Sequence, residues 1–321
     1  MKKILGLCIL ISCISCRKTE RHDVSGTPSH RITINRFDQT FYNTGSSKDT
    51  AFLELYANQI MKVGEPGTPM FQQFDSIFRN DKQMRQIYND CQAAFKDVKP
   101  IEEKLTWAFH RLHSFFPDIP YPKVYMHISG FGESIVSAPG ILSASIDKYL
   151  GPEYPLYQTL FNPYQTQRMY PDKVVSDYMT GWVRSEFTES SMLSQQRLLD
   201  YMIYEGKLLY FMKMLLPDEK MEAISGFSAE QIIWCTKNEK KIWDTMIKYQ
   251  HLYSADPLII SKYIADAPTT SFLSKEAPGR VAVWTGLRIV EQFMEKKPDV
   301  SIQNLLKTNI REILSESLYH P

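Results

Sequence analysis

The sequence has almost no net charge, no second long apolar run and few cysteines, and each lack narrows the class of protein. The 37 basic and 36 acidic residues leave a formal charge of +1 at pH 7, so neither nucleic acid nor an anionic membrane surface is indicated as a partner. Beyond the first residues, no apolar run is long enough to cross a bilayer. Outside the N-terminal segment the cysteines are Cys91 and Cys235. An oxidising compartment would permit them to pair, but our default expectation is that each is a buried hydrophobic residue.

The sequence also lacks the short motifs of common active sites. It contains no GxSxG, no P-loop and no GxGxxG pattern. A Ser-His-Asp triad would leave no local motif, because its members need not be neighbours. His110 and His113 are one helical turn apart and could face a metal together. They adjoin the apolar face of Phe109, Leu112 and Phe116 without a nearby acidic or cysteine partner, so we expect packing rather than metal binding.

The N-terminal segment has the pattern of an export signal. Two lysines precede a short apolar run, and a small residue precedes each of two cysteines. Leu10-Ile11-Ser12-Cys13 fits the pattern at which bacterial lipoproteins are cut and acylated, and Cys16 is the second candidate. Residues 1–16 are therefore predicted to be a lipoprotein signal, with cleavage before Cys13 or Cys16. The acyl chains would anchor the protein in membrane lipid without spanning the bilayer.

Helical spacing dominates the rest of the chain. Residues 17–31 are predicted to be a polar tether, and residues 32–321 a single globular domain. Apolar residues recur every three or four positions in several segments: 51–63, 70–79, 82–95, 102–116, 171–187 and 194–216. A short strand is expected within 31–37, and segments 123–131 and 141–147 predict a hairpin or two adjacent strands. The predicted fold class is α+β, predominantly α-helical with a small β-sheet.

A charged residue interrupts the apolar stripe of segment 194–216. Glu205 lies in the middle of that stripe, where a carboxylate must be paired, hydrogen-bonded or protonated. Lys207 and Arg280 are the candidate partners, and Arg280 is preferred because a guanidinium can hold a carboxylate with two hydrogen bonds. Arg280 would also begin a helix, where the helix dipole disfavours a cation. An acidic residue should offset it, and Glu205 or Asp177 would do so.

The order of predicted elements resembles that of gluzincin zinc peptidases: strands, then a helix, then a second helix with Glu-Gly. In those enzymes the first helix carries HExxH and the second supplies a glutamate as third zinc ligand. Here residues 177–181, DYMTG, would occupy the HExxH register, which leaves Glu205 and Asp177 as ligands. Catalytic zinc normally has three protein ligands. The sequence thus predicts a degenerate site with no metal, no other cofactor and no catalytic residue.

Segments spread along the whole chain carry a family resemblance. They include INRFDQTFY near the start, SIDKYLGPEYPLY (145–157), DYMIYEGKLLY (200–210), GFSAEQIIWCTKNEKKIWDTMI (226–247), LYSADP (252–257), APGRVAVWTGLRIVEQFM (277–294) and the closing SLYHP. Together these resemble the GldB family of gliding motility lipoproteins of the Bacteroidota. The resemblance implies a cell-envelope lipoprotein grouped with the gliding and type IX secretion machinery. It brings no established reaction, cofactor or catalytic residue.

Three functional hypotheses follow from these observations. The first is a non-catalytic, membrane-tethered protein that descends from or mimics a zinc peptidase and binds an envelope protein partner through the former peptidase cleft. Its cleft or buried charges would be Asp177, Glu205, Lys207 and Arg280. The second is a peptidase-like hydrolase that acts on envelope peptide or peptidoglycan through Asp177, Glu205 and their neighbours. The third is a structural assembly subunit whose cleft is filled. All three place the protein in the cell envelope, on the outer membrane or a periplasmic face.

Overall fold

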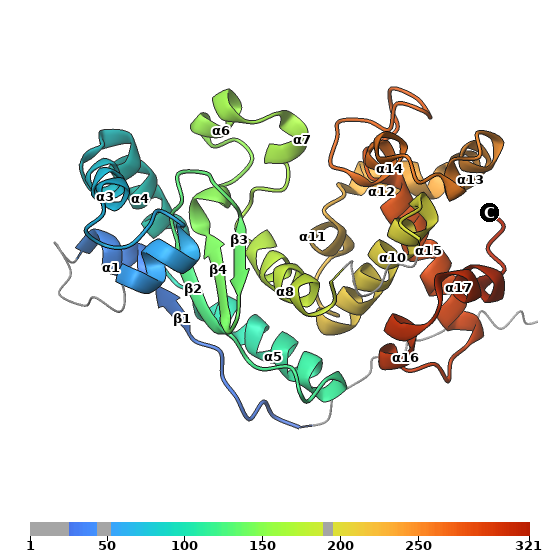
Figure 1. Cartoon of the computed structure of the whole chain (residues 1–321), viewed down its shortest axis with the longest axis horizontal. Coiled ribbons are helices and arrows are strands. Elements are labelled where there is room, and N and C mark those ends of the chain that lie inside the picture. The colour runs from blue at the N-terminus through green and yellow to red at the C-terminus, as the bar shows by residue number, and fades with distance from the viewer. Residues whose placement is uncertain (1–25, 44–52, 189–194) are drawn as a thin grey trace, which may run out of the picture.

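The computed structural model describes residues 26–43, 53–188 and 195–321. The predicted signal and both candidate lipidation sites, Cys13 and Cys16, lie outside these residues. The structure is about 59% helical and contains a four-stranded mixed sheet, which confirms the predominantly helical α+β fold (Figure 1). None of the helices in the described ranges is both long and apolar enough to span a membrane.

The first half of the chain alternates helices with the strands of the sheet. Its elements are β1 (Ile34–Arg36), α1 (Phe37–Asn43), the π-helix η1 (Leu55–Ile60), α3 (Pro69–Asn80), α4 (Lys82–Ala94), α5 (Lys99–Phe115), β2 (Lys123–His127), β3 (Ile135–Ala138), β4 (Ile141–Ser145), the 3-10 turn η2 (Ile146–Lys148), α6 (Pro155–Leu160) and α7 (Pro163–Thr166).

The second half is helical. Its elements are α8 (Lys173–Glu186), α10 (Leu198–Leu215), α11 (Met221–Ser225), α12 (Ala229–Lys237), α13 (Glu239–Lys248), the 3-10 turn η3 (His251–Tyr253), α14 (Pro257–Ile264), α15 (Val281–Lys296), α16 (Ile302–Lys307) and α17 (Ile310–Ser317). In Figure 1 the helices that follow α8 lie on the far side of α8 from the sheet.

Local sequence explains where several helices begin. The side chains of Thr68 and Asp81 accept hydrogen bonds from backbone N–H groups in the first turns of α3 and α4, which satisfies donors that a helix start leaves free. Ser228 does the same for α12 together with Gln231, in a capping box. The helices predicted over 70–79, 82–95, 102–116, 171–187 and 194–216 are confirmed to within a few residues.

The sheet has the strand order β1-β2-β4-β3. Strands β1, β2 and β4 are parallel neighbours, and β3 pairs antiparallel with β4 at the edge. The prediction of adjacent strands over 123–131 and 141–147 is therefore confirmed, whereas the hairpin alternative is wrong for them. The reason is β3, which the sequence did not reveal as a separate strand: it lies between β2 and β4 in the chain and runs opposite to both, so the chain reverses twice and β4 runs in the same direction as β2.

Both faces of the sheet are covered. Val124 and Met126 of β2 belong to the main hydrophobic core, which continues from the sheet through α8 into the C-terminal helices. Tyr125, which points to the opposite face, belongs to a smaller cluster with aromatic residues of α1, η1 and α3, among them Phe37 and Phe74. Cys91 and Cys235 are free and buried in the main core, as expected, and burial raises the pKa of both thiols.

Two glycines allow α10 and α15 to pack backbone against backbone. A Cβ on Gly286 would overlap the carbonyl oxygen of Met202, and a Cβ on Gly206 would overlap the backbone of Gly286. No larger residue fits either position unless the two helices move apart. This contact sets where α10 lies, and so where the neighbouring Glu205 is held.

Candidate functional site

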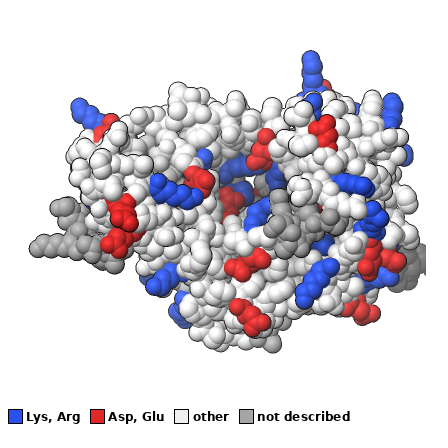
Figure 2. Space-filling view, in the orientation of Figure 1, with Lys and Arg blue, Asp and Glu red and all other residues white. Residues whose placement is uncertain are grey.

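A cavity of about 470 Å³ lies between the edge of the sheet and the C-terminal helices. Figure 2 shows Lys, Arg, Asp and Glu side chains gathered in a hollow near the middle of the visible face. The cavity wall holds five cations and three carboxylates: Lys148, Arg168, Lys173, Arg184 and Arg280, and Asp177, Glu205 and Asp266. Five positive against three negative charges leave a surplus of two, in a protein whose total charge is +1.

Helix α8 supplies one side of the cavity through a single helical stripe. Lys173, Asp177, Thr180 and Arg184 follow one another at spacings of four, three and four residues, so they share a face. The Nζ atom of Lys173 lies 2.6 Å from Oδ1 of Asp177, and the hydroxyl of Tyr149 donates to Oδ2 at 2.9 Å. Burial raises the pKa of Tyr149, and the charge of Asp177 raises it further. Asp177 thus lines the cavity, with both carboxylate oxygens engaged.

Glu205 of α10 pairs with a cation that the sequence argument did not name. A guanidinium nitrogen of Arg184 donates to Oε2 of Glu205 at 2.6 Å, and the glutamate side chain is 8% exposed. Glu205 is therefore buried and ion-paired, as predicted, but both proposed partners are wrong. Lys207 cannot serve, because residues two apart on a helix point to different sides.

Lys207 is a buried charge with a separate structural role. Its ammonium donates to the carbonyl oxygens of Leu306 at 3.1 Å and Thr308 at 2.7 Å. These carbonyls lie at the C-terminal end of α16, where a helix leaves acceptors free and favours a cation. Burial lowers the pKa of Lys207 to about 8. Lys207 is buried, as predicted, but it does not line the cavity.

Arg280 lines the cavity but takes Asp266 as its acidic partner. Its Nε lies 3.4 Å from Oδ1 of Asp266, and its backbone is left-handed with φ of +63° where α15 begins. The preceding turn packs tightly on the loop after α14, since a Cβ on Gly279 would overlap the carbonyl oxygen of Ala267. That packing brings Arg280 beside Asp266. The expected pairing of Arg280 with Glu205 is wrong for this reason.

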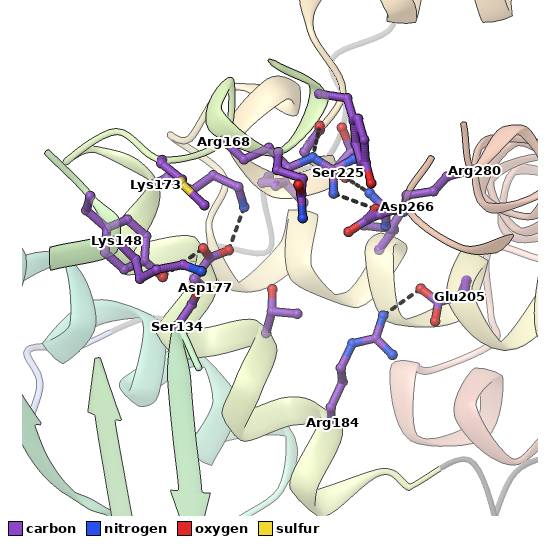
Figure 3. Close-up of a pocket in the computed structure, with 18 of the residues that line it drawn as sticks. Ser134, Lys148, Arg168, Lys173, Asp177, Arg184, Glu205, Ser225, Asp266 and Arg280 are labelled. Atoms are coloured by element: carbon purple, nitrogen blue, oxygen red, sulfur yellow. Dashed lines mark hydrogen bonds and ion pairs between the residues drawn. The ribbon is translucent and has the colours of Figure 1, made fainter. Parts of the chain in front are cut away.

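The C-terminal end of α11 orients three of the cations (Figure 3). The helix ends at Gly226, whose left-handed backbone (φ +73°) leaves the last carbonyls free to accept hydrogen bonds. Three cavity cations donate to these carbonyls: Lys173 to Ala223 at 2.8 Å, Arg280 to Ser225 at 2.7 Å and Arg168 to Gly226 at 2.8 Å. The positive charges are therefore held in place by backbone atoms before any ligand arrives.

Arg168 and Arg280 converge on the same carboxylate oxygen. A guanidinium nitrogen of Arg168 lies 2.6 Å from Oδ1 of Asp266, the atom that also faces Arg280. Burial alone would raise the pKa of Asp266, but the two arginines lower it below the ordinary value. Burial lowers the pKa of Arg280 and the charge of Arg168 lowers it further, whereas Asp266 and Glu205 raise it. One carboxylate thus balances two guanidinium groups.

The register that a zinc peptidase would use for HExxH holds no metal-binding set. A Cβ on Gly181 would lie 2.5 Å from Cγ2 of Ile135 on β3, so a histidine does not fit there without a shift of that strand. Tyr178 is buried and its hydroxyl donates to the carbonyl oxygen of Tyr125 at 2.6 Å. In the parts of the chain that the structure describes, no three His, Cys, Asp or Glu side chains are grouped to hold a metal ion. The prediction that the protein binds no catalytic metal stays a prediction.

His110 and His113 lie away from this cavity. The ring of His113 packs on Tyr121 with centroids 5.0 Å apart, and that of His110 contacts Trp107 at 5.8 Å. Neither histidine lines the cavity. Both rings take part in aromatic packing, and the expectation that they bind no metal stays a prediction.

Sequence reasoning missed five residues of the charged wall. Lys173 and Arg184 lie four residues before and seven after Asp177, so helical periodicity was a signal that would have found them. Arg168 and Asp266 follow α7 and α14 in irregular segments, and Lys148 ends a 3-10 turn. No periodic pattern marks those three residues, because loops set their positions.

The family comparison covers nearly the whole chain. A family model described as "Gliding motility protein GldB", whose name also marks the family as lipoproteins, matches residues 17–321. The chain therefore belongs to the GldB family, which confirms the resemblance seen in its sequence. Comparisons with curated proteins and with solved structures found no match.

Proposed function

We propose that this GldB-family chain is a lipid-anchored protein of the cell envelope that binds another envelope component through its central cavity and catalyses no reaction. Family membership associates the chain with gliding motility and with lipoproteins. Acylation at Cys13 or Cys16 would supply the anchor, since two or three acyl chains hold a protein firmly on a membrane. The mature domain would then face the periplasm or the surface of the outer membrane.

The observation that carries this proposal is the state of the three cavity carboxylates. Asp177, Glu205 and Asp266 each lie 2.6 Å from a lysine or arginine nitrogen. A general acid or base needs a pKa near the working pH, and an adjacent cation favours the ionised carboxylate instead. Carboxylates paired in this way fix the positions of the lysine and arginine side chains in the cavity wall, where these cations can contact a ligand. The arrangement supports binding better than hydrolysis.

A zinc-peptidase ancestor is the origin that we propose for the cavity. Its wall takes Ser134, just before β3, several residues of α8, and Glu205 of α10, close to the elements that would carry the cleft edge and the ligands of a gluzincin. Gly181 against Ile135 supports the loss of the metal position. Stoichiometric zinc in protein purified without added metal would instead favour the peptidase-like hydrolase.

The anchor is tested by cell fractionation. Replacing Cys13 and Cys16 together by serine should move the protein from the membrane fraction to the soluble fraction, because the acyl chains are lost. The single variants identify which cysteine carries the lipid. Unchanged membrane partition of the double variant, with a mature N-terminus elsewhere, would contradict the anchor.

The binding role is tested by site-specific photo-crosslinking in intact cells. A photoreactive residue at Thr180, which lines the cavity, should give an adduct with an envelope component. The matched control is Lys240 on α13, which is exposed and outside the cavity. An adduct pattern that is the same at both positions, or absent at Thr180, would contradict binding through the cavity.

A further inference from the structure

The cavity carries more positive charge than its own carboxylates neutralise. Five cations face three carboxylates, and the bound carbonyls of Ala223, Ser225 and Gly226 carry no net charge. The surplus of two is concentrated in one partly open cavity, where screening by salt is weaker than on a flat surface. A ligand with two negative charges would balance this surplus.

Lys148 is the cation that the cavity does not neutralise. Its ammonium lies 4.5 Å from the centroid of the Phe161 ring, and among the described residues it forms no ion pair. The residue is half-buried, and burial lowers the pKa of its ammonium. The charge of the neighbouring Asp147 only partly offsets this burial, and a desolvated charge that forms no ion pair is unfavourable for stability. Its place in the cavity wall is explained if a bound anion supplies the missing partner.

Arg280 gives a second, independent sign of the same kind. It is a cation at the beginning of the 16-residue helix α15, in a left-handed backbone conformation. Both features are unfavourable for a non-glycine, positively charged residue. Together with Arg168 it directs guanidinium groups toward one carboxylate oxygen of Asp266. Such costs are typical of residues retained for binding rather than for stability.

We propose that the cavity binds a small dianionic ligand through oxygen acceptors, with Lys148, Arg168 and Arg280 as the main binding residues. Guanidinium groups match the geometry of phosphate and carboxylate oxygens. The volume of about 470 Å³ lies within the usual range of small-molecule sites. This inference rests on the proposed binding role of the cavity and names the chemistry that the cavity recognises.

The dianion can be a compact phosphate or an extended dicarboxylate, and titration calorimetry distinguishes the two. The full-length lipoprotein in detergent is titrated with inorganic phosphate, succinate and acetate, in a buffer that contains no other multivalent anion. We expect phosphate or succinate to bind at about 1 mM or tighter, and acetate at least about tenfold more weakly. Raising NaCl from about 50 to about 500 mM should weaken binding several-fold.

Lys148→Gln is the variant that tests the site, and Lys248→Gln is its matched control. Both lysines lie over an aromatic ring, Lys248 at 5.3 Å from the centroid of Tyr249, but Lys248 is exposed and outside this cavity. Lys148→Gln should weaken binding of the preferred anion about tenfold, the usual effect of one charge-assisted hydrogen bond. Lys248→Gln should leave affinity unchanged. Arg168→Gln gives a second reading and should weaken binding at least as much as Lys148→Gln.

Two results would overturn the inference. One is that phosphate and succinate bind no more tightly than acetate. The other is that the Lys148 and Lys248 variants have equal affinity. The crosslink at Thr180 separates this failure from failure of the proposed function: an adduct that forms while the dianions do not bind would keep the binding role and reject the dianion.

Discussion

Helix α10 borders two regions of opposite chemistry at neighbouring residues. Gly206 packs against Gly286 of α15 in an apolar contact so close that neither position accepts a Cβ. Glu205, one residue earlier, faces the charged cavity and pairs with Arg184. In the contact between α10 and α15, the close approach of the two backbones determines which residue fits. In the cavity, the balance of positive and negative charge determines it.

The packed interior as a whole, which includes the sheet, also differs from the cavity in how it holds titratable groups. His127, buried in the sheet with Nδ1 2.7 Å from the hydroxyl of Ser143, is kept neutral because burial lowers its pKa to about 3. In the cavity, by contrast, each of the three carboxylates forms an ion pair with a lysine or an arginine. The packed interior therefore carries the stability of the fold, whereas the cavity wall keeps charges available for a ligand. Four substitutions test this difference, in order of expected effect.

Gly286→Ala should have the largest effect. The added methyl group overlaps the carbonyl oxygen of Met202, and overpacking of backbone against backbone is expected to lower the free energy of unfolding by about 3 kcal/mol or more. Denaturant unfolding measures it. Gly132→Ala is the control, since Gly132 is exposed and an added Cβ would lie 3.2 Å from the side-chain oxygen of Ser129, without overlapping any backbone atom. Equal stability of the two variants would show that α15 can shift away from α10 at little cost.

Arg184→Met should come second. It leaves Glu205 buried without its cation, so the free energy of unfolding should fall by about 2 kcal/mol. This value lies between the loss of roughly 3–5 kcal/mol for breaking a fully buried pair and about 0–1 kcal/mol for an exposed pair. The double variant with Glu205→Gln should lose less stability than the sum of the single variants. Arg280→Met serves as the comparison and should be closer to additive with Glu205→Gln. Stronger coupling to Arg280 than to Arg184 would reject the pairing described here.

The neutral state of His127 predicts a pH dependence of intermediate size. Below pH 6.5 the unfolded chain protonates this histidine, whereas the folded protein does not until about pH 3. Stability should therefore fall as pH falls, by about 1.4 kcal/mol per pH unit from this group. Unfolding at pH 7.5 and pH 5 in wild type and His127→Gln measures the contribution. The same slope in both proteins would mean that His127 is protonated in the folded state.

Lys148→Gln should have the smallest effect on stability. The ammonium forms no ion pair among the described residues, and burial disfavours its charge more than the nearby Asp147 favours it. The free energy of unfolding should stay within about 0.5 kcal/mol of wild type, as thermal or denaturant unfolding would show. A large loss would place Lys148 with the packing residues rather than with the binding wall.

Helical periodicity predicted much of the fold because it depends only on residues that are close together in the sequence. The segments that became α8 and α10 were predicted to within a few residues, and the burial of Glu205 followed from the same spacing. Strand β3 escaped because its four residues carry no alternating pattern strong enough to separate them from the surrounding loops. The direction of β4 relative to β2 was missed for the same reason.

The sequence by itself determined the features that local pattern and composition contain. These are the N-terminal signal pattern, the predominantly helical fold, the family, and a buried carboxylate at Glu205 that needs a cation. Only the tertiary structure decided which cation pairs with Glu205. Arg184, Lys207 and Arg280 carry the same charge, and they differ in where packing places their side chains. It also brought Arg168, Asp266 and Arg280 together from three loops. Which residues come together depends on distances in space. Loop geometry and the contact of Gly206 with Gly286 set these distances, and spacing along the chain does not reveal them.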